Sequence, residues 1–168
     1  MIERLSITPT DSERRPAIHR LVPFVYVTDI NATLAFYALL GFAVREILRD
    51  ADGGPNWAWA ETRPGGTRGV VAQLMFSRTW RPIVPGRQDI FFYMYTLDLS
   101  ALRRRLLSEG VNDGGGANAW DVPEEVPRAT RTLFAIHYPP YMPAGEMRVH
   151  DPDGYCILVG QLDEPIHA

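Results

Sequence analysis

The sequence predicts an α+β fold made of two βαβββ modules, with the helices on one face of the sheets. Two observations lead to this prediction. An apolar run ends at Asp29, and Gly41 follows twelve residues later; a second apolar run ends at Asp98, and Gly110 follows at the same spacing. Each aspartate stands where a helix favours an N-cap, and each glycine where a helix favours a left-handed C′ residue. The chain therefore looks like one module built twice.

The first module is expected at residues 19–77. Residues 1–18 are polar, show no periodicity and contain two prolines, so they are expected to form an N-terminal arm. Ile30, Leu34 and Tyr37 form the apolar stripe of the predicted helix. Glycine- and proline-rich turns separate the strands that follow. The predicted elements, in order, are a strand at 21–28, a helix at 30–40, and strands at 42–49, 57–62 and 69–77.

The second module is expected at residues 89–168, after a linker at 78–88. It repeats the order of the first but carries a glycine-, proline- and charge-rich insertion at 112–131. The run from Asp151 to Gly154 is a strong turn signal and predicts a hairpin. The predicted elements are a strand at 90–97, a helix at 99–109, and strands at 133–137, 146–150 and 155–161.

Bulk properties exclude several classes of function. The 168 residues are long enough to bury about 70% of the unfolded surface, and the composition is that of a globular protein, with a net charge of −3. All 17 basic residues are arginine, which excludes Schiff-base chemistry and a P-loop lysine. The apolar runs are too short to span a bilayer, and no membrane or nucleic-acid partner is expected. The single cysteine, Cys156, excludes an internal disulfide and suits a cytoplasmic location.

Two stretches, residues 25–42 and 146–161, resemble the vicinal oxygen chelate superfamily, and residues 98–111 support the likeness more weakly. This superfamily includes glyoxalase I, extradiol dioxygenases and bleomycin-resistance proteins. The resemblance implies that each module curls its sheet into half of a cup. Together the modules would form a cup-shaped, partly closed mixed sheet with helices on the outer face. It also implies a homodimer.

The metalloenzymes of this superfamily place their ligands at fixed points in the two modules. In this sequence the corresponding positions hold Val22, Met75, Phe91 and Leu158. None of these side chains binds a divalent metal by ordinary His, Asp or Glu chemistry. The resemblance therefore implies neither a metal nor another cofactor in this chain.

Aromatic side chains are expected to line the cup instead. Residues two apart on a strand share a face, so the strands near residues 24 and 93 each present alternating rings to the cup. Such a lining suits a flat apolar ligand; the alternative is that these rings are core or pack against a second subunit. The predicted ligand-binding residues are Phe24, Tyr26, Trp57, Trp59, Gln73, Met75, Phe91, Tyr93, Tyr95, Arg148 and Leu158.

Polar residues near the predicted rim provide candidates for catalysis. Glu146, Arg148 and His150 alternate along one strand and point to rim contacts or general acid/base chemistry; the alternative is a solvated edge face. His137 precedes a proline-rich segment, residues 138–143, that resembles a lid loop, although a structural role for this histidine is also open. A non-standard metal site built from these residues with His19 and Glu61 would lack recognisable ligand spacing.

The sequence therefore favours a metal-free protein that binds a hydrophobic or aromatic small molecule, by sequestration of the bleomycin-resistance type used in antibiotic resistance. Bleomycin itself is a poor fit, because it is cationic and the cup is not notably acidic. The alternative is a glyoxalase- or dioxygenase-like enzyme, of lyase or isomerase type, that uses a non-standard metal site or the residues His137, Glu146 and His150. A third hypothesis is a structural or regulatory module whose cup is filled by its own side chains.

Overall fold

The computed structural model describes residues 20–63, 69, 72–85, 90–116 and 130–162. The predicted N-terminal arm, residues 1–18, and residues 117–129 of the predicted insertion lie outside this part of the chain. Within it, no helix is both long and apolar enough to cross a membrane.

The first module, taken here as β1–β4 with α1, has a four-stranded sheet in the order β1-β4-β3-β2. The first strand pairs in parallel with the last, and the other neighbours are antiparallel. The elements are β1 (Phe24–Val27), α1 (Ile30–Leu39), β2 (Phe42–Arg49), β3 (Pro55–Thr62) and β4 (Ala72–Arg78).

The second module, β5–β9 with α2, has a five-stranded sheet in the order β5-β9-β8-β7-β6. Here too the first strand pairs in parallel with the last, and a parallel pair of two-residue strands ends the sheet. The elements are β5 (Phe91–Thr96), α2 (Leu99–Ser108), β6 (Asn112–Asp113), β7 (Thr132–Leu133), β8 (Glu146–His150) and β9 (Cys156–Gln161).

Both helices begin and end for the reasons that the sequence suggests. The Asp29 carboxylate accepts two backbone N–H bonds from the first turn of α1, and the Asp98 carboxylate accepts one from α2. Gly41 and Gly110 have φ angles of 92° and 81°. Only glycine adopts this region at little cost, so each helix ends where the chain must reverse into the next strand or loop.

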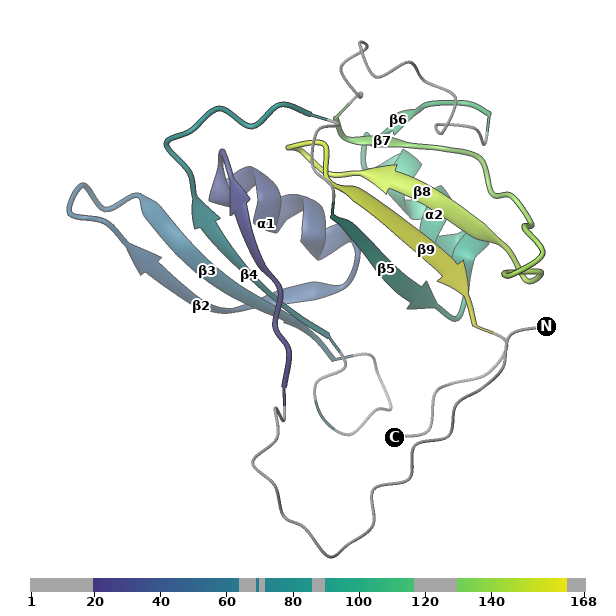
Figure 1. The fold of residues 1–168 in the computed structure, drawn as a ribbon, viewed down its shortest axis with the longest axis horizontal. Coiled ribbons are helices and arrows are strands. Elements are labelled where there is room, and N and C mark those ends of the chain that lie inside the picture. The colour runs from purple at the N-terminus through teal and green to yellow at the C-terminus, as the bar shows by residue number, and fades with distance from the viewer. Residues whose placement is uncertain (1–19, 64–68, 70–71, 86–89, 117–129, 163–168) are drawn as a thin grey trace, which may run out of the picture.

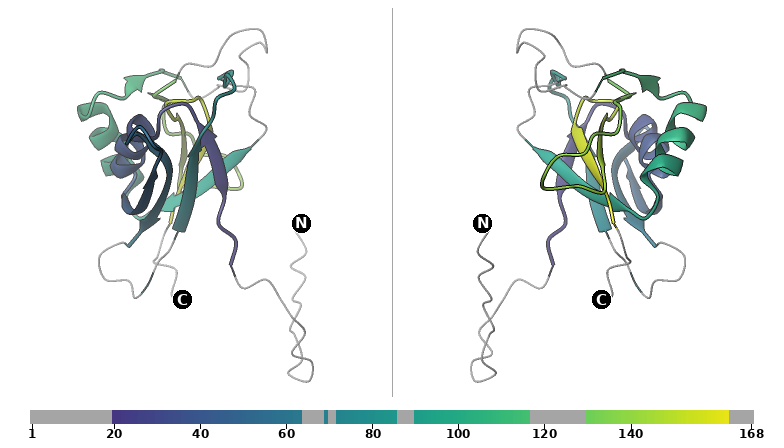
Figure 2. Two further views of the ribbon diagram at one scale, coloured as in Figure 1. Left: turned by 90° about the vertical axis from the view of Figure 1, so that its left-hand side faces the viewer. Right: turned by 90° about the vertical axis from the view of Figure 1, so that its right-hand side faces the viewer.

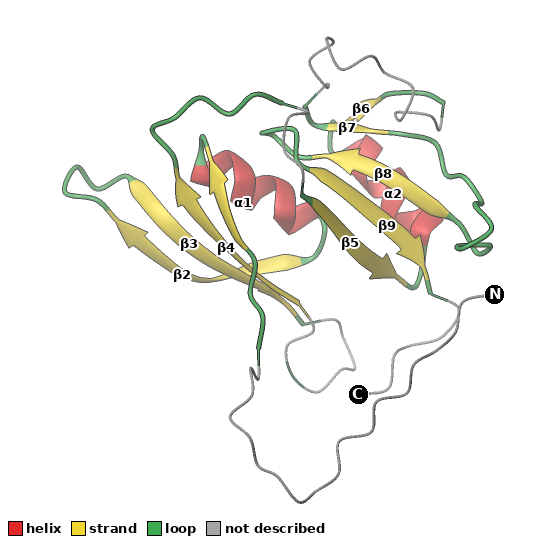
Figure 3. Cartoon of the chain, in the orientation of Figure 1, coloured by secondary structure: helices red, strands yellow, loops and turns green. Residues whose placement is uncertain are grey.

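The two sheets lie side by side, with β1 and β5 at the centre (Figure 1). Helices α1 and α2 lie on the same side of both sheets (Figure 2). The core lies between the helices and the sheets, and its fully buried side chains include Phe36, Phe76, Leu106 and Ile157. Figure 3 shows that neither α1 nor α2 covers the opposite side of the sheets, which we call the open face. The predicted α+β class and the partly closed, cup-like arrangement are confirmed.

The packed face of α1 is broader than the predicted stripe. Ile30 and Tyr37 are buried as predicted, and Leu34 is partly buried against the core, but Thr33 and Phe36 are buried as well. Helix α1 is apolar around most of its circumference, so the pattern alone does not identify its packed face.

The strand predicted at 133–137 is regular only at Thr132–Leu133, although Phe134 and His137 continue to bond to β8. In addition, β6 lies at the start of the segment predicted as an insertion. Two-residue strands are too short to produce a periodic signal.

The second module contacts the first through the turn between β8 and β9. The Thr28 amide donates to Asp153 Oδ2 at 3.0 Å, and the Tyr155 hydroxyl donates to the carbonyl of Tyr26 at 2.9 Å. Gly154, with a φ of 81°, closes this turn as predicted. The turn therefore both links two strands and joins the two modules.

Asp151 lies at the centre of this junction and is fully buried. It accepts bonds from the amides of Asp153 and Tyr155, each at 2.9 Å, and from the Tyr37 hydroxyl at 3.3 Å. Burial is the largest influence and raises the pKa of Asp151 to about 7, since the bonds from the two amides offset only part of the desolvation. The junction consequently contains a carboxyl group that titrates near neutral pH.

Candidate functional site

The two central strands present aromatic side chains on the open face. Along β1 and β5 these side chains alternate with Val25, Val27 and Phe92, which belong to the buried core. The rings on the open face are between 39% and 54% exposed, which is unusual for side chains of this size. They are Phe24, Tyr26, Phe91, Tyr93 and Tyr95.

The first module extends this aromatic surface across three strands. Met75 of β4 is paired with Phe24 on one side and with Trp59 on the other. Ser77 is paired in the same way with Tyr26 and Trp57. Because paired residues share a face, both tryptophans lie on the open face, and both are partly exposed. The structure therefore brings together the predicted ligand-binding residues of this module.

A charged cluster borders this aromatic surface. The buried Glu61 carboxylate accepts bonds from Arg45 at 2.8 Å, Gln73 at 3.2 Å and Arg63 at 2.6 Å. The bond from Arg45 is the main reason that the pKa of Glu61 is lowered. The Arg45 guanidinium also lies 4.7 Å from the centre of the Trp59 ring. Glu61 thus holds a cation against one of the aromatic rings.

The open side of β8 is buried, in contrast to that of β3. Glu146, Arg148 and His150 are 0%, 2% and 1% exposed. The suggestion that these residues form a solvated edge is therefore wrong, because β8 lies between two strands, and Phe134 and Tyr141 contact the side chains of His150 and Glu146. Leu158, at 9% exposed, is buried in the same region.

Three side chains contact the Glu146 carboxylate. The Tyr93 hydroxyl donates to Oε2, the Tyr141 hydroxyl donates to Oε1 at 3.0 Å, and His137 Nε2 lies 3.1 Å from Oε1. Burial and the bond to Glu146 raise the pKa of Tyr93. Tyr93 therefore stays protonated at neutral pH. Within the described part of the chain, the buried Nδ1 of His137 has no hydrogen-bond partner.

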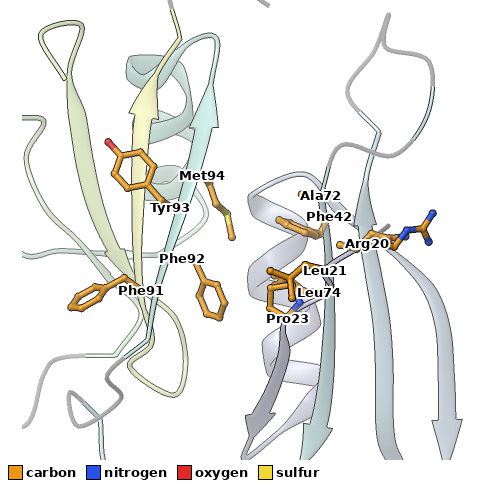
Figure 4. Close-up of a pocket in the computed structure, with 11 residues that line it drawn as sticks. Arg20, Leu21, Pro23, Phe42, Ala72, Leu74, Phe91, Phe92, Tyr93 and Met94 are labelled. Atoms are coloured by element: carbon orange, nitrogen blue, oxygen red, sulfur yellow. The ribbon is translucent and has the colours of Figure 1, made fainter. Parts of the chain in front are cut away.

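A cleft of about 470 Å³ lies between the modules, beside the free edge of β5. Phe92 and Met94 point across it toward Phe42 of the first module, whereas Phe91 and Tyr93 point to the other side of the strand (Figure 4). Residues from both faces of β5 line the cleft. The cleft therefore extends around the edge of β5 as far as the open face. Its volume is within the ~300–1,000 Å³ typical of small-molecule sites.

The predicted site residues thus divide into three groups. Gln73, Phe91 and Tyr93 line the cleft, and the other aromatic residues, with Met75, lie on the open face outside it. Arg148 and Leu158 are buried in the second module. Arg45, Tyr141 and Met142 are contacts that sequence reasoning missed as site residues. Arg45 lies at a register shift between β2 and β3 that no sequence pattern announces, whereas the proline-rich run around Tyr141 was a visible signal.

Metal-ligating side chains do not gather in the described part of the chain, where no three His, Cys, Asp or Glu residues lie together. The positions that hold ligands in the metalloenzymes of the resembled superfamily carry apolar side chains here. The residues present therefore do not fit a metal of that type.

Comparison with known proteins identifies the fold. No family model matches the chain, and no curated protein matches it in sequence. A bleomycin resistance determinant encoded on the transposon Tn5 is 19% identical, with a TM-score of 0.57 over 88% of this chain and 100% of that chain. A bleomycin-binding protein complexed with bleomycin is 20% identical, with a TM-score of 0.54 over 87% and 100% of the two chains.

A glyoxalase-related enzyme from Clostridium phytofermentans is 16% identical, with a TM-score of 0.60 over 89% of this chain and 98% of that one. The chain therefore has the fold of the vicinal oxygen chelate superfamily, as the resemblance implied. At such identities the similarity defines the fold alone. This fold is shared by a bleomycin-binding protein and by a glyoxalase-related enzyme.

Proposed function

We propose that this chain binds a flat hydrophobic or aromatic small molecule on its open face and sequesters it without turnover. The observation that carries the proposal is the row of exposed aromatic side chains on β1 and β5, continued by Trp57 and Trp59 on β3. Exposed apolar surface of this extent marks a binding surface. The cleft beside β5 offers space for an apolar part of the same ligand.

The polar groups of the site limit which charge the ligand can carry. Glu61 and Glu146, both buried, already accept hydrogen bonds from neighbouring side chains. Neither carboxylate is therefore free to pair with a cationic ligand, which argues against cationic bleomycin. The proposed ligand is a neutral or anionic aromatic molecule.

Tryptophan fluorescence provides the test, because two of the four tryptophans, Trp57 and Trp59, lie on the open face. Titration with the flat aromatic probe 1-anilinonaphthalene-8-sulfonate should quench their emission saturably. Phe91→Ala and Tyr93→Ala should each weaken binding about 2- to 10-fold, since one ring stack contributes roughly 0.5–1.5 kcal/mol. Tyr138→Ala, which truncates an exposed tyrosine away from β1 and β5, is the matched control. Equal affinity of all four proteins would show that the open face is not the site.

A second candidate is an enzyme that uses His137 and Glu146 as acid/base groups. One observation favours this candidate: His137 Nε2 lies 3.1 Å from Glu146 Oε1. Glu146 also accepts a hydrogen bond from Tyr93, which lines the cleft. Such an enzyme would convert a bound aromatic substrate with a bell-shaped pH–rate profile, and His137→Ala would lose rate rather than affinity. Recovery of unchanged ligand after prolonged incubation with the protein would exclude this candidate for that ligand.

We also infer a homodimer and a cytoplasmic location. Leu21 and Trp80, at 86% and 87% exposed, add apolar surface outside the aromatic row, and a second copy of the chain would bury it. Sedimentation velocity measures the assembly state directly. Cys156, the single cysteine of the sequence, is buried, which suits a reducing compartment. The module limits of 19–77 and 89–168 are likewise proposals, which limited proteolysis would test.

A further inference from the structure

The two modules correspond residue by residue, which allows their open faces to be compared. Phe24 and Tyr93 each lie five residues before the capping aspartate of their module. The strand register places Phe24, Met75 and Trp59 in one row across the first sheet. It places Tyr93, Leu158 and Arg148 in the corresponding row across the second sheet. In the next row, Tyr26, Ser77 and Trp57 correspond to Tyr95, Gly160 and Glu146.

Corresponding residues on the open faces of the two modules differ in solvent exposure. Trp57 and Trp59 of the first module are partly exposed, whereas their counterparts Glu146 and Arg148 are almost completely buried. The difference arises in one hairpin. In the first module, residues 50–54 connect β2 and β3 by a short turn. In the second module the corresponding connection is residues 138–145, which we call the covering loop.

The backbone of the covering loop is held by regular hydrogen bonds. His137 and Glu146 exchange two backbone bonds of 2.9 Å at its base. Within the loop, the Met142 amide donates to the Pro139 carbonyl at 2.9 Å, and the Gly145 amide donates to the Met142 carbonyl at 3.0 Å. The loop therefore consists of two successive turns with a defined shape.

Two side chains of the covering loop lie on the open side of β8 and β9. The Tyr141 hydroxyl donates to Glu146 Oε1 at 3.0 Å. Met142 lies on Gly160, where an added Cβ would be 3.0 Å from its methyl carbon and 3.3 Å from its sulfur. The missing side chain of Gly160, which corresponds to Ser77 of the first module, thus makes room for the thioether.

We propose that Tyr141 and Met142 occupy, on the second module, the place that a ligand occupies on the first. Each chain then has one aromatic ligand site, on the first-module half of the open face and the adjoining β5, and a second, closed site floored by Leu158 and Gly160. This inference rests on the proposed function. The closed site would accept the same class of flat aromatic molecule, because Tyr93 and Tyr95 flank it as Phe24 and Tyr26 flank the first.

Removal of the two covering side chains tests this inference. Isothermal titration with 1-anilinonaphthalene-8-sulfonate should give one molecule per chain for the wild type and two for the Tyr141→Ala/Met142→Ala variant. The control Tyr138→Ala shortens an exposed side chain of the same loop and should still bind one. Trp59→Ala should weaken the original site in every background. Near-UV circular dichroism establishes that each variant retains its tertiary structure.

The outcomes separate the two proposals. A folded double variant that still binds one molecule, or a wild type that already binds two, would overturn the assignment of the covering loop. In either case a weakening by Trp59→Ala would leave the proposed function standing. A wild type without saturable binding would overturn the proposed function, and the one-site assignment with it. If the double variant loses its tertiary structure, Met142→Ala alone replaces it in the same titration.

Discussion

Glu146 combines complete burial with hydrogen bonds from two tyrosine hydroxyl groups. A carboxylate removed from water is costly unless donors replace its hydration. Tyr93 and Tyr141 supply such donors from two different segments of the second module, and His137 Nε2 lies 3.1 Å from the same carboxylate. Glu146 therefore fixes the position of Tyr93, which in turn reaches the cleft and the open face.

Glu146→Ala should lower the free energy of unfolding by about 1–3 kcal/mol, because it leaves buried or partly buried donors without an acceptor. Tyr141→Phe removes one donor only, at an exposed side chain, and should cost less than about 1 kcal/mol. Urea denaturation monitored by circular dichroism measures both values. A cost for Glu146→Ala no larger than that for Tyr141→Phe would contradict the central role of this carboxylate.

Among the elements, α1 depends on its N-cap. Asp29 accepts from the amides of Asn31 and Ala32 at 2.8 and 3.1 Å. Asp29→Ala should cost about 1 kcal/mol in unfolding free energy, whereas Asp29→Asn, which keeps an acceptor, should be close to neutral. Thermal unfolding of the two variants provides the measurement. Equal destabilisation by both would mean that charge, and not the cap, is the important property.

Elements with a strong local signal could be predicted from sequence. The bounds of β2 and β8 were predicted to the residue, and both helices to within one residue at their C-terminal ends, since caps and alternating apolar residues specify them. The alternation also placed Phe24 and Tyr26 opposite Val25 and Val27. The short β6 and β7 carried no such signal.

The part of the site that could not be predicted depends on contacts distant in sequence. Glu146, Arg148 and His150 alternate with apolar residues, which locally indicates a polar, exposed face. Their burial depends on the covering loop and on Tyr93, which lies 53 residues before Glu146. The cleft likewise depends on the separation of two edge strands. Strand periodicity describes one strand at a time. It therefore predicts neither the burial of β8 by distant residues nor the separation of the two edge strands.

At the scale of the whole molecule, the junction between the modules is sensitive to pH. The pKa of Asp151 is about 7 in the folded protein, against an ordinary value of about 3.9 when unfolded. The folded state thus binds the proton more tightly. The stability that Asp151 contributes is fully present below about pH 4 and is lost as the pH rises through 7.

The free energy of unfolding should therefore carry a contribution that decreases by on the order of 3 kcal/mol between pH 4 and pH 8. Asp151→Asn retains the shape and an acceptor for the amides of Asp153 and Tyr155, and should remove this contribution. Urea titrations of both proteins at four pH values measure the difference in slope. If the free energy of unfolding changed equally with pH in the wild type and in Asp151→Asn, Asp151 would not be the source of the pH dependence.

The strand order also determines when each sheet can form during biosynthesis. In both modules the first strand pairs with the last, so β1 has no partner until β4 leaves the ribosome, and β5 has none until β9 does. Moreover, β9 lies inside the second sheet, between β5 and β8. Of the strands in this sheet, β9 is synthesised last, and it is the strand that connects β5 to β8. A stop codon before residue 156 would abolish the second sheet and not merely trim its edge.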